Sequence, residues 1–464
     1  MRTNIFRLGL FLLGILLVFA AYLSYIAVYR GPAIAFHPYN RRWQVLEEKI
    51  SRGKIYDATG TVLAYDQKIS QGKRRVYSLG EATAHVLGYC SARYGRAGLE
   101  AFLDRHLLGM EGSDSFRNLV RSLLGEQKAG GDVFLTIDAQ LQQKSMELLG
   151  GRRGAVVVLD PRTGAVRAMV SSPSFDPNRL DQIWEEINAD EFSPLLNRAT
   201  CGAYPPGSSF KVVTAAAALT ADQDLARRVI DCPGYIDVEG FRLGDVAAHG
   251  RVDLIRALAV SCNTYFASLG LEAGAVAFYR TVKNFGFEED PGLGLPVRPA
   301  TFAPPGKLKG AELAASAIGQ GEVLVSPLHM AMAAAAVANE GVLMRPYLIE
   351  ELLDSSGRTV QRAEPRAWKT ALPAAAAAVI REGMVEAVAR GTAGAAGLSG
   401  VQVAGKTGSA QNPLGKTHAW FIGFAPASKP RLAVAVILEN AGSGGEAAAP
   451  LAGKLFSLAF ARGY

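Results

Sequence analysis

An uncharged run close to the N-terminus constrains this chain more than any other feature. Residues 1–7 (MRTNIFR) are basic, and residues 8–29 carry no charged side chain. As a helix, the run would span about 33 Å, enough to cross a hydrocarbon core of about 30 Å. It is longer than the apolar core of a signal peptide, and no small-residue cleavage site closes it. We therefore expect a short tail (1–7), an uncleaved transmembrane anchor (8–29) and a remainder on one side of the membrane. Arginines on both sides of the run leave its orientation open.

The length and charge of the chain narrow the classes of function. With 464 residues it can hold two or three domains with sizeable cores. The net charge of +7 is modest, and no block of Lys and Arg interleaved with aromatic residues indicates a nucleic-acid partner. The basic balance is compatible with an anionic surface such as lipid headgroups or cell wall.

The cysteines, at positions 90, 201, 232 and 262, form no C-x-x-C pair and have no histidine at metal-ligand spacing. This pattern argues against a zinc site, and we expect neither a metal nor a cofactor. Cys201 and Cys232 could form a disulfide in an oxidising compartment. Two buried free thiols are equally compatible with the sequence.

Two segments follow the anchor. Residues 30–131 alternate short extended pieces with turns, contain a helical stretch at 98–108, and end in a polar stretch, 111–131, that is typical of a linker. From residue 132 a strand leads into a helix that starts near Asp138, and residues 155–172 have the pattern of a hairpin.

The last part of the chain alternates helical and extended patterns. Ala-rich helices are expected at 311–339 and 373–390, strands at 401–410, 418–426 and 430–440, and a closing helix at 446–462. Strands at both ends with helices between them predict an α+β domain in which an antiparallel sheet packs on helices.

The segment 204–219 (YPPGSSFKVVTAAAAL) places a serine at the start of a strongly apolar helix. Ser208 and Lys211 are three residues apart, which puts both side chains on one helix face, about 5–6 Å apart at Cβ. N–H groups at a helix start lack intrahelical partners, so negative charge beside Ser208 would be stabilised. The spacing alone is weak, because the pairs 51/54 and 70/73 repeat it without an apolar helix. Alone, Ser208 is equally compatible with a helix cap.

Two further motifs change the interpretation of Ser208. Ser261-Cys262-Asn263 is the only Ser-x-Asn of the chain, and Lys406-Thr407-Gly408 is the only Lys-Thr/Ser-Gly. Ser-x-x-Lys, Ser-x-Asn and Lys-Thr-Gly in this order mark penicillin-binding proteins and class A β-lactamases. The motifs lie in PLLNRATCGAYPPGSSFK, HGRVDLIRALAVSCNTYF and AGKTGSAQ, with HAWFIGFAP after them and RGKIYDATGTVLA and YGRAGLE before. Over nearly its whole length the chain resembles class B penicillin-binding proteins, the membrane-anchored peptidoglycan D,D-transpeptidases.

The resemblance implies an architecture and a location. It implies a penicillin-binding/β-lactamase-like transpeptidase domain at 132–464, of α+β fold, behind a small pedestal (dimerisation-like) domain at 30–131. Residues 1–7 would lie in the cytoplasm, the anchor would cross the bacterial inner membrane once, and the catalytic domain would be periplasmic or otherwise extracytoplasmic. Expected partners are peptidoglycan stem peptides, β-lactams and a polytopic glycosyltransferase of the shape, elongation, division or sporulation family.

The chemistry needs a base for the serine, and without a His-Asp pair in the sequence Lys211 is the candidate. Its pKa must then be lowered by burial or by a second cation, for which Lys406 is the obvious choice. By resemblance, Ser208 attacks the carbonyl of the penultimate D-Ala of a stem peptide, and Ser261 relays the proton to the leaving amine. Asn263 would hold Lys211 and the substrate amide.

The third motif and the residue after it would bind the substrate. By resemblance, Lys406 and Thr407 suit recognition of the terminal carboxylate. Gly408 would allow the edge strand close to the substrate backbone. The N–H groups of Ser208 and Ser409 would form the oxyanion hole.

Several other residues are expected to be structural. Cys262 should point away from the face that Ser261 and Asn263 share. The remaining residues with this expectation are histidines without a partner motif and loop-forming glycines near the cleft: His85, His106, His249, His418, Gly319 and Gly321.

Two alternative functions remain open. The first is a hydrolase on the same scaffold, a D,D-carboxypeptidase or β-lactamase, which would use water as the acceptor. The second is a non-catalytic β-lactam sensor. The sequence offers no convincing Glu-x-x-x-Asn segment for a deacylating base and no signalling domain, so both are less favoured than the transpeptidase.

Overall fold

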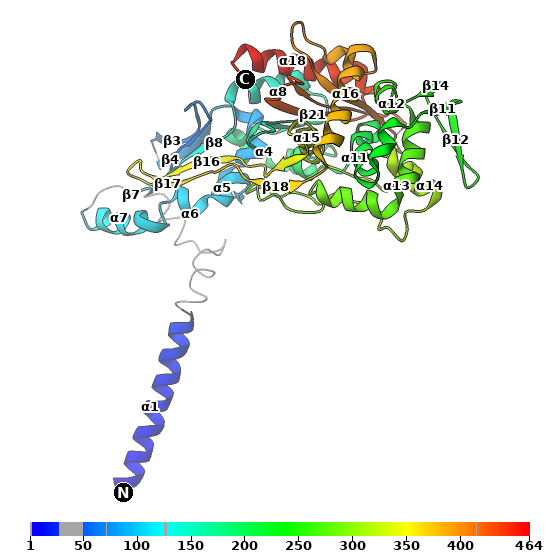
Figure 1. Ribbon diagram of the computed structural model, residues 1–464. Coiled ribbons are helices and arrows are strands. Elements are labelled where there is room, and N and C mark those ends of the chain that lie inside the picture. The colour runs from blue at the N-terminus through cyan, green and yellow to red at the C-terminus, as the bar shows by residue number, and fades with distance from the viewer. Residues whose placement is uncertain (1, 27–49, 71, 125–127, 414) are drawn as a thin grey trace.

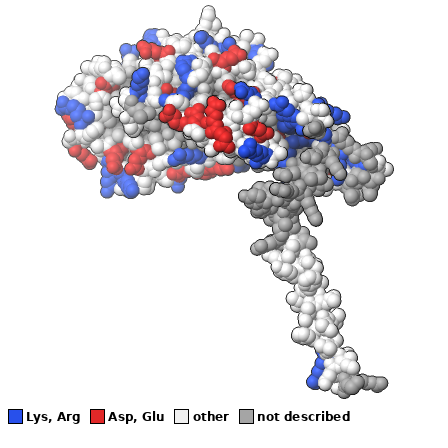
Figure 2. Space-filling view, turned by 180° about the vertical axis from the view of Figure 1, so that it is seen from behind, with Lys and Arg blue, Asp and Glu red and all other residues white. Residues whose placement is uncertain are grey.

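The computed structural model describes residues 2–26, 50–70, 72–124, 128–413 and 415–464. Helix α1 (Arg2–Tyr25) stands outside the folded body (Figure 1). Beyond Arg7 its side chains are uncharged (Figure 2). Among the described residues it is the one helix long and apolar enough to cross a membrane, with Thr3–Tyr25 as the candidate span. The helix begins earlier than the predicted anchor, whose bounds at 8–29 stay a prediction, and residues 27–29 lie outside the described residues.

A five-stranded sheet forms the centre of the body. Its order is β10-β9-β21-β20-β19, and every neighbouring pair is antiparallel. The strands are β9 (Gly154–Leu159), β10 (Val166–Ser172), β19 (Ala404–Ala410), β20 (His418–Ala425) and β21 (Leu432–Leu438). The predicted hairpin and the predicted C-terminal strands are confirmed. Strand β19, which carries the Lys-Thr-Gly motif, lies at an edge of the sheet.

Helices cover both faces of this sheet. Successive side chains of a strand point to opposite faces, so that Val157 and Ala435 join one apolar cluster while Val156 and Val436 join the other. Helix α15 (Pro327–Ala338) packs on the first face, and α8 (Ala139–Leu149) and α18 (Ala449–Ala461) pack on the second. The predicted α+β fold, an antiparallel sheet packed on helices, is confirmed.

The motif-bearing helices lie beside the first face and pack on one another. Helix α11 (Lys211–Ala221) packs on α13 (Asn263–Asn284), which also contacts α14 (Gly310–Ala317), and α12 (Leu254–Val260) packs on α16 (Ala374–Arg390). Small side chains allow this close packing, and the predicted Ala-rich helices are confirmed as α14, α15 and α16. The shorter helices of this part are α9 (Leu180–Ala189), α10 (Arg198–Cys201) and α17 (Gly444–Ala447).

Between α11 and α12 the chain forms two small antiparallel strand pairs. Strand β11 (Ile230–Cys232) pairs with β14 (Gly250–Val252), and β12 (Tyr235–Val238) pairs with β13 (Phe241–Gly244). Strands β11, β12 and β13 contact α13. The two pairs are drawn at the right of the body in Figure 1.

A second, six-stranded sheet joins segments that are far apart in sequence. Its order is β17-β16-β8-β2-β3-β4. Strands β2 (Ile55–Tyr56), β3 (Val62–Ile69) and β4 (Gly72–Tyr77) come from the predicted pedestal. Strands β8 (Asp132–Leu135), β16 (Ile349–Leu353) and β17 (Thr359–Arg362) come from the predicted catalytic domain. The domain boundary at 131/132 stays a prediction, and residues 30–49 lie outside the described residues.

The prediction of a linker at 111–131 was wrong. Residues 112–123 form helix α7 (Gly112–Leu123), and β7 (Lys128–Ala129) pairs with β1 (Ile50–Ser51). The polar side chains of α7 have protein partners instead of solvent: the buried Asp114 accepts hydrogen bonds from the N–H and hydroxyl of Ser355, and Arg117 pairs with Asp354 at 2.7 Å.

The other short elements of the chain surround these sheets. The helical stretch predicted at 98–108 is present as α5 (Gly98–Phe102) and α6 (Asp104–Leu107). The remaining helix and strands are α4 (Ala84–Leu87), β5 (Cys90–Ser91), β6 (Gly95–Arg96), β15 (Val342–Met344) and β18 (Ala367–Thr370).

Candidate active site

Ser208 lies in a tight turn that leads into α11. Residues Gly207–Phe210 form a 3-10 helix, and the regular helix begins at Lys211. Gly207 has a φ of 53° and donates its N–H to the carbonyl of Gly319 at 2.9 Å, so the loop of Gly319 supports the turn as expected. Ser208 Oγ makes no capping bond and has no hydrogen-bond partner among the described residues. The capping interpretation of Ser208 is therefore wrong, and the hydroxyl is free to face a cavity.

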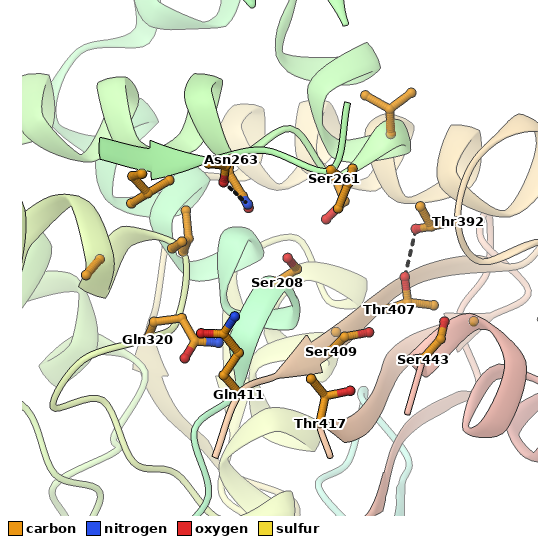
Figure 3. Close-up of a pocket in the computed structure, with 18 of the residues that line it drawn as sticks. Ser208, Ser261, Asn263, Gln320, Thr392, Thr407, Ser409, Gln411, Thr417 and Ser443 are labelled. Carbon is orange, nitrogen blue, oxygen red and sulfur yellow. Dashed lines mark hydrogen bonds between the residues drawn. The ribbon is translucent and has the colours of Figure 1, made fainter. Parts of the chain in front are cut away.

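The cavity has a volume of about 570 Å³ and is lined by hydroxyl and amide side chains together with apolar ones (Figure 3). Ser208, Ser261, Asn263, Thr407, Gly408 and Ser409 all line it. The structure thus brings all three motifs to one place. Lys211 and Lys406 are fully buried and lie behind the cavity wall.

Lys211 is held by the second motif. Its Nζ donates to the carbonyl oxygen of Ser261 at 2.5 Å, to Ser261 Oγ at 3.2 Å and to Asn263 Oδ1 at 2.6 Å. Asn263 in turn donates its Nδ2 to the carbonyl of Gly244 at 3.0 Å. The amide of Asn263 therefore fixes the lysine from the side of β13.

Ser261 stands at the junction of two helices, as predicted. It ends α12 with a φ of 63°, and α13 begins two residues later at Asn263. A left-handed conformation at a residue other than glycine costs on the order of 1 kcal/mol. This conformation directs both the carbonyl and the hydroxyl of Ser261 towards Lys211.

Lys406 approaches the same hydroxyl from the edge strand. Its Nζ donates to Ser261 Oγ at 2.9 Å and to the carbonyl of Thr407 at 3.0 Å. The Ser261 hydroxyl is therefore shared by two amines, one from α11 and one from β19. Such a bridge offers a path for a proton between them.

Burial lowers the pKa of both lysines. Burial lowers the pKa of Lys211 to about 7, although Asp245 and Cys262 act to raise it. Burial, together with the charge of Lys211, lowers the pKa of Lys406 well below its ordinary value. Burial is therefore the main cause of the shift at Lys211, and the expected repulsion between the two cations acts on Lys406.

Gly408 is needed for contact between the edge strand and the nucleophile turn. A Cβ at Gly408 would lie 2.8 Å from the carbonyl oxygen of Pro206 and 2.9 Å from the N of Ser209. Gly408 therefore lies close to the backbone of the chain itself. The sequence had instead predicted a close approach to the backbone of the substrate. Ser409 is exposed, and its hydroxyl accepts a hydrogen bond from the N–H of Gly444 at 3.2 Å.

Five cavity residues with a hydroxyl or amide side chain were missed by the sequence reasoning. They are Gln320, Thr392, Gln411, Thr417 and Ser443. Gln320 lies between Gly319 and Gly321, so the glycine loop was the available signal for it. Thr392 Oγ1 lies 2.7 Å from Thr407 Oγ1, but no motif surrounds it.

The residues expected to be structural have structural contacts. Cys262 Sγ points to Asp245 Oδ2 at 3.1 Å and does not line the cavity. His85 is buried on the carbonyl of Pro194, and His418 Nδ1 accepts the N–H of Asn440. All the cysteines are free thiols, and Cys201 donates to the carbonyl of Pro296. Among the described residues, one group suited to a metal exists, and it lies outside the cavity: Cys232, Asp245, His249 and Cys262.

A serine backed by two buried amines, beside an edge strand and a polar cavity, defines an active-serine acyltransferase of the penicillin-recognising type. Residues 154–457 match the family described as the penicillin binding protein transpeptidase domain, and residues 52–133 match the penicillin binding protein A dimerisation domain. The chain therefore belongs to the penicillin-binding protein transpeptidase family.

Individual relatives agree with this assignment. The chain is 35% identical to peptidoglycan D,D-transpeptidase PbpA of Mycolicibacterium smegmatis, with 97% of each chain covered. It is 32% identical to peptidoglycan D,D-transpeptidase MrdA of Acinetobacter baumannii, over 82% of this chain and 65% of that relative. Among solved structures, the ceftriaxone acyl-enzyme complex of penicillin-binding protein A from M. tuberculosis superposes with a TM-score of 0.84 at 34% identity, covering 89% of this chain and 99% of that one.

Proposed function

We propose that this chain is a peptidoglycan D,D-transpeptidase that works through an acyl-enzyme on Ser208. Two relatives carry that activity in their names, and a structural neighbour forms an acyl-enzyme with a β-lactam. The observation that carries the proposal is the bridge at Ser261, whose Oγ is 3.2 Å from Lys211 Nζ and 2.9 Å from Lys406 Nζ. Ser208 and Ser261 line the same cavity.

In the acylation step, Lys211 accepts the proton of Ser208 Oγ, which attacks the carbonyl carbon of the penultimate D-Ala of a stem peptide. The N–H groups of Ser208 and Ser409 stabilise the oxyanion. The peptide C–N bond then breaks, and the proton passes from Lys211 through the Ser261 hydroxyl to the leaving amine of the terminal D-Ala. The balance is one amide broken and one serine ester formed.

In the deacylation step, an amine of a second stem peptide attacks the ester carbonyl. The amine loses its proton to Lys211, a new amide forms, and Ser208 Oγ leaves and regains a proton from Lys211. This step reverses the proton path of acylation. It differs from hydrolysis only in the acceptor.

The substrate carboxylate is bound by the third motif. The hydroxyl of Thr407 faces the cavity and donates to the carboxylate, whereas Lys406 supplies positive charge from behind the wall, because its side chain is fully buried. Asn263 positions Lys211 through its Oδ1 and lines the cavity where the substrate amide would lie.

Labelling with a fluorescent penicillin tests the nucleophile. We expect covalent label on the wild-type chain and none on Ser208→Ala, with thermal unfolding used to check that the variant folds. Ser428→Ala, at an exposed serine outside the cavity, serves as the matched control and should label like wild type. Full labelling of Ser208→Ala would show that another residue is acylated.

Incubation with a donor peptide and a D-amino acid acceptor separates transfer from hydrolysis. A transpeptidase gives the exchanged peptide in addition to free D-Ala. Free acid as the sole product would instead identify a D,D-carboxypeptidase, hydrolysis of the penicillin label a β-lactamase, and stable acylation without turnover of peptide a sensor.

The proposal includes a location and a partner. Helix α1 anchors the chain in the bacterial inner membrane with residues 1–7 in the cytoplasm and the catalytic domain outside it, where peptidoglycan lies. The partner is a polytopic glycosyltransferase, which supplies the glycan strands that a transpeptidase cross-links. Protease accessibility of the body in spheroplasts tests the orientation. Co-purification from detergent-solubilised membranes, with a chain lacking residues 1–26 as the comparison, tests the partner.

A further inference from the structure

We propose that Arg242 binds a second carboxylate of the donor stem peptide, one at the end of an aliphatic side chain on the residue that precedes the two D-Ala. Arg242 belongs to β13 and lines the catalytic cavity. Among the described residues that line this cavity, Arg242 alone has a charged side chain. The inference rests on the proposed function, which gives this cation no ligand.

The guanidinium group of Arg242 is held in one orientation by side chains of the neighbouring strand. Its Nε donates to Asp237 Oδ1 at 2.9 Å, and its Nη2 donates to Asp237 Oδ2 at 3.0 Å. Its Cζ lies 4.2 Å from the centroid of the Tyr235 ring. In the β12–β13 register Asp237 stands directly opposite Arg242, and Tyr235 is two residues before Asp237, so the three side chains share one face of the strand pair. A ligand therefore meets a cation that is already ordered, and little rotamer entropy is lost on binding.

One edge of the guanidinium group is free for a ligand. Arginine has five N–H donors, and Asp237 takes one on Nε and one on Nη2. The other edge, formed by Nη1 and Nη2, has no partner among the described residues, and the Arg242 side chain is 64% exposed. A carboxylate fits such an edge through two parallel N–H···O bonds. Arg242 can therefore keep its pair with Asp237 and bind a second carboxylate.

The place of β13 at the cavity identifies the part of the substrate that Arg242 meets. In Figure 3, Asn263 and Thr407 lie on opposite sides of Ser208. The terminal carboxylate of the donor binds at Thr407 in the proposed function, so the acyl part of the peptide extends from Ser208 towards Asn263. Asn263 Nδ2 donates to the carbonyl of Gly244 at 3.0 Å, and Gly244 ends the strand that carries Arg242. The charged side chain therefore lies on the acyl side of the scissile bond.

Exposed apolar side chains beside Arg242 suit an aliphatic stem on the ligand. Phe241 and Val246 are 55% and 79% exposed, and both line the cavity. An aliphatic chain that crosses them removes apolar surface from water on both partners, which favours binding. A long side chain with a terminal carboxylate thus fits this wall of the cavity better than a short acidic side chain.

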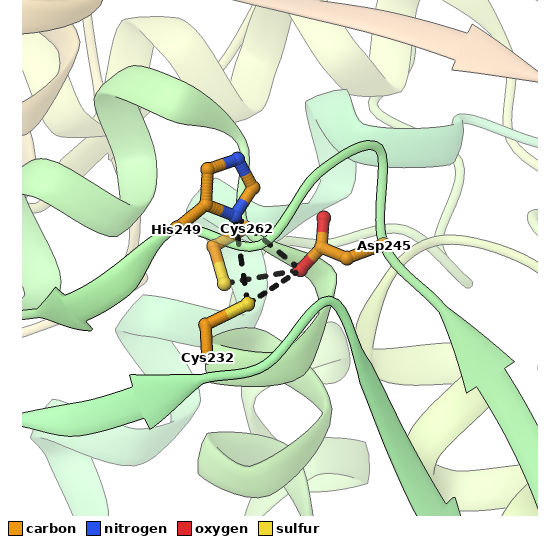
Figure 4. A group of neighbouring side chains, drawn as sticks. All are labelled: Cys232, Asp245, His249 and Cys262. Atoms are coloured by element: carbon orange, nitrogen blue, oxygen red, sulfur yellow. Dashed lines mark hydrogen bonds and ion pairs between the residues drawn. The ribbon is translucent and has the colours of Figure 1, made fainter.

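The strand that carries Arg242 is fixed to the second motif. Asp245, the residue after β13, accepts hydrogen bonds from Cys262 Sγ at 3.1 Å (Figure 4) and from the N–H of Thr264 at 2.9 Å. Leu243 is buried and belongs to the main apolar cluster of the body. These contacts hold β13 beside the cavity, so that Arg242 is presented from a well-anchored backbone.

Exchange kinetics with two donor peptides test the proposal. One is acetyl-L-α-aminopimelyl-D-Ala-D-Ala, whose side chain ends in a carboxylate, and the other carries a carboxamide in place of that carboxylate. With the full chain in detergent and a D-amino acid acceptor, we expect the wild type to favour the carboxylate peptide about tenfold in kcat/KM, as for a hydrogen bond to a charged group. Repulsion by Asp237 limits the effect. Added salt should reduce the preference, because charges at an exposed site are screened.

Substitutions of Arg242 locate the source of the preference. In Arg242→Gln the ratio of the two kcat/KM values should fall close to one, whereas Arg242→Lys, which keeps the charge but not the planar edge, should retain part of it. Arg251→Gln is the matched control, because Arg251 is an exposed arginine of β14 that does not line the cavity. This control should keep the wild-type preference. Thermal unfolding checks that each variant folds.

The outcomes separate this inference from the function on which it rests. A wild type that exchanges both peptides with equal kcat/KM overturns the role of Arg242 and leaves the transpeptidase assignment in place, and this comparison needs no variant. A preference that persists in Arg242→Gln also overturns the role of Arg242. A wild type that exchanges neither peptide overturns the proposed function itself.

Discussion

At the scale of single residues, Ser261 adopts an unfavourable backbone conformation that serves the proposed proton transfer. Its left-handed backbone is an unfavourable choice for a serine, yet it lets one residue present a carbonyl and a hydroxyl to Lys211 and the same hydroxyl to Lys406. Both amines are buried. Burial disfavours their charged forms, so that both release their protons more readily than an exposed lysine does. The proton-transfer properties of the site follow from this arrangement.

The first prediction is a pH dependence of acylation. Because burial lowers the pKa of Lys211 to about 7, the second-order rate constant for penicillin labelling should rise about tenfold per pH unit below pH 7 and level off above it. The measurement is stopped-flow or gel-based labelling from about pH 5.5 to about pH 8.5. A rate that does not change over this range would mean that Lys211 is not the base.

The same shift predicts the direction of a stability change. An unfolded lysine titrates near pH 10.4, so between about pH 7 and about pH 10 the unfolded chain binds more protons than the folded one. At Lys211, the free energy of unfolding should therefore rise with pH across that window. Denaturant unfolding of wild type and Lys211→Met at several pH values measures it, and the variant should lack the lysine's share of the slope.

The third residue-scale prediction concerns Gly408. In Gly408→Ala the new Cβ would meet backbone atoms of Pro206 and Ser209 at 2.8 and 2.9 Å, so β19 must move away from the nucleophile turn. Overpacking of this kind costs about 1–3 kcal/mol, and we expect the labelling rate to fall at least about tenfold. Gly306→Ala is the matched control, since a Cβ there would have no atom within 4 Å. Equal rates for the two variants would contradict the role given to Gly408.

At the scale of secondary-structure elements, a buried ion-pair network joins the strands and helices of the N-terminal part. Arg52 pairs with Glu100 and with Asp104, both at 2.7 Å, and Arg75 pairs with Glu100 at 2.7 Å. Burial alone would raise the pKa of Glu100, but the two guanidinium groups hold it below its ordinary value. The network therefore fixes β4 and α5 to the segment after β1.

Removal of one partner of this network should be costly. In Arg52→Met, Glu100 loses a partner while remaining fully buried, a loss that costs about 3–5 kcal/mol. We expect a lower denaturation midpoint for the variant, measured by urea unfolding. Arg366→Met breaks only an exposed pair with Glu364 and should change the midpoint little. A large change in that control would mean that exposed charge, not burial, controls the stability.

Many of the secondary-structure elements could be predicted from the order of the motifs and from local sequence patterns. The hairpin at 155–172, the Ala-rich helices and the serine at the mouth of α11 all follow from periodicity within a short window. Helix α7 did not, because its stability depends on Asp354 and Ser355, which follow it by more than two hundred residues. The group of Cys232, Asp245, His249 and Cys262 was not predicted for the same reason, because the two cysteines reach Asp245 and His249 only through tertiary packing.

The candidate site also contains residues that could be predicted from the sequence and residues that could not. Ser208, Lys211, Ser261, Asn263 and Lys406 were found because three short motifs kept their local form. Thr392 belongs to no such motif and reaches the cavity only through the packing of its segment on α12, whereas Gln411 stands three residues after Gly408 in the quoted segment AGKTGSAQ. The sequence argument required the pKa of Lys211 to be lowered by burial or by a second cation, and burial lowers it.

At the scale of the whole molecule, α1 and the body are separate in their packing. No residue in the most apolar window of the candidate span is buried in the described chain. A chain lacking residues 1–26 should therefore remain folded, pass into the soluble fraction without detergent, and label with penicillin at the rate of the full chain. Fractionation and labelling of the two forms in parallel measure this. Loss of labelling in the shortened form would mean that α1 stabilises the catalytic part.

The six-stranded sheet also has a consequence for how the protein is made. Strands β2, β3 and β8 are synthesised early, but their neighbours β16 and β17 end only at Arg362. During synthesis the nascent chain must therefore carry β8 as an open strand edge while more than two hundred further residues leave the ribosome. Open edges invite mispairing and aggregation. Cells that produce this protein are thus expected to depend on a chaperone during its biogenesis, and truncated products that stop before Ile349 should be proteolysed.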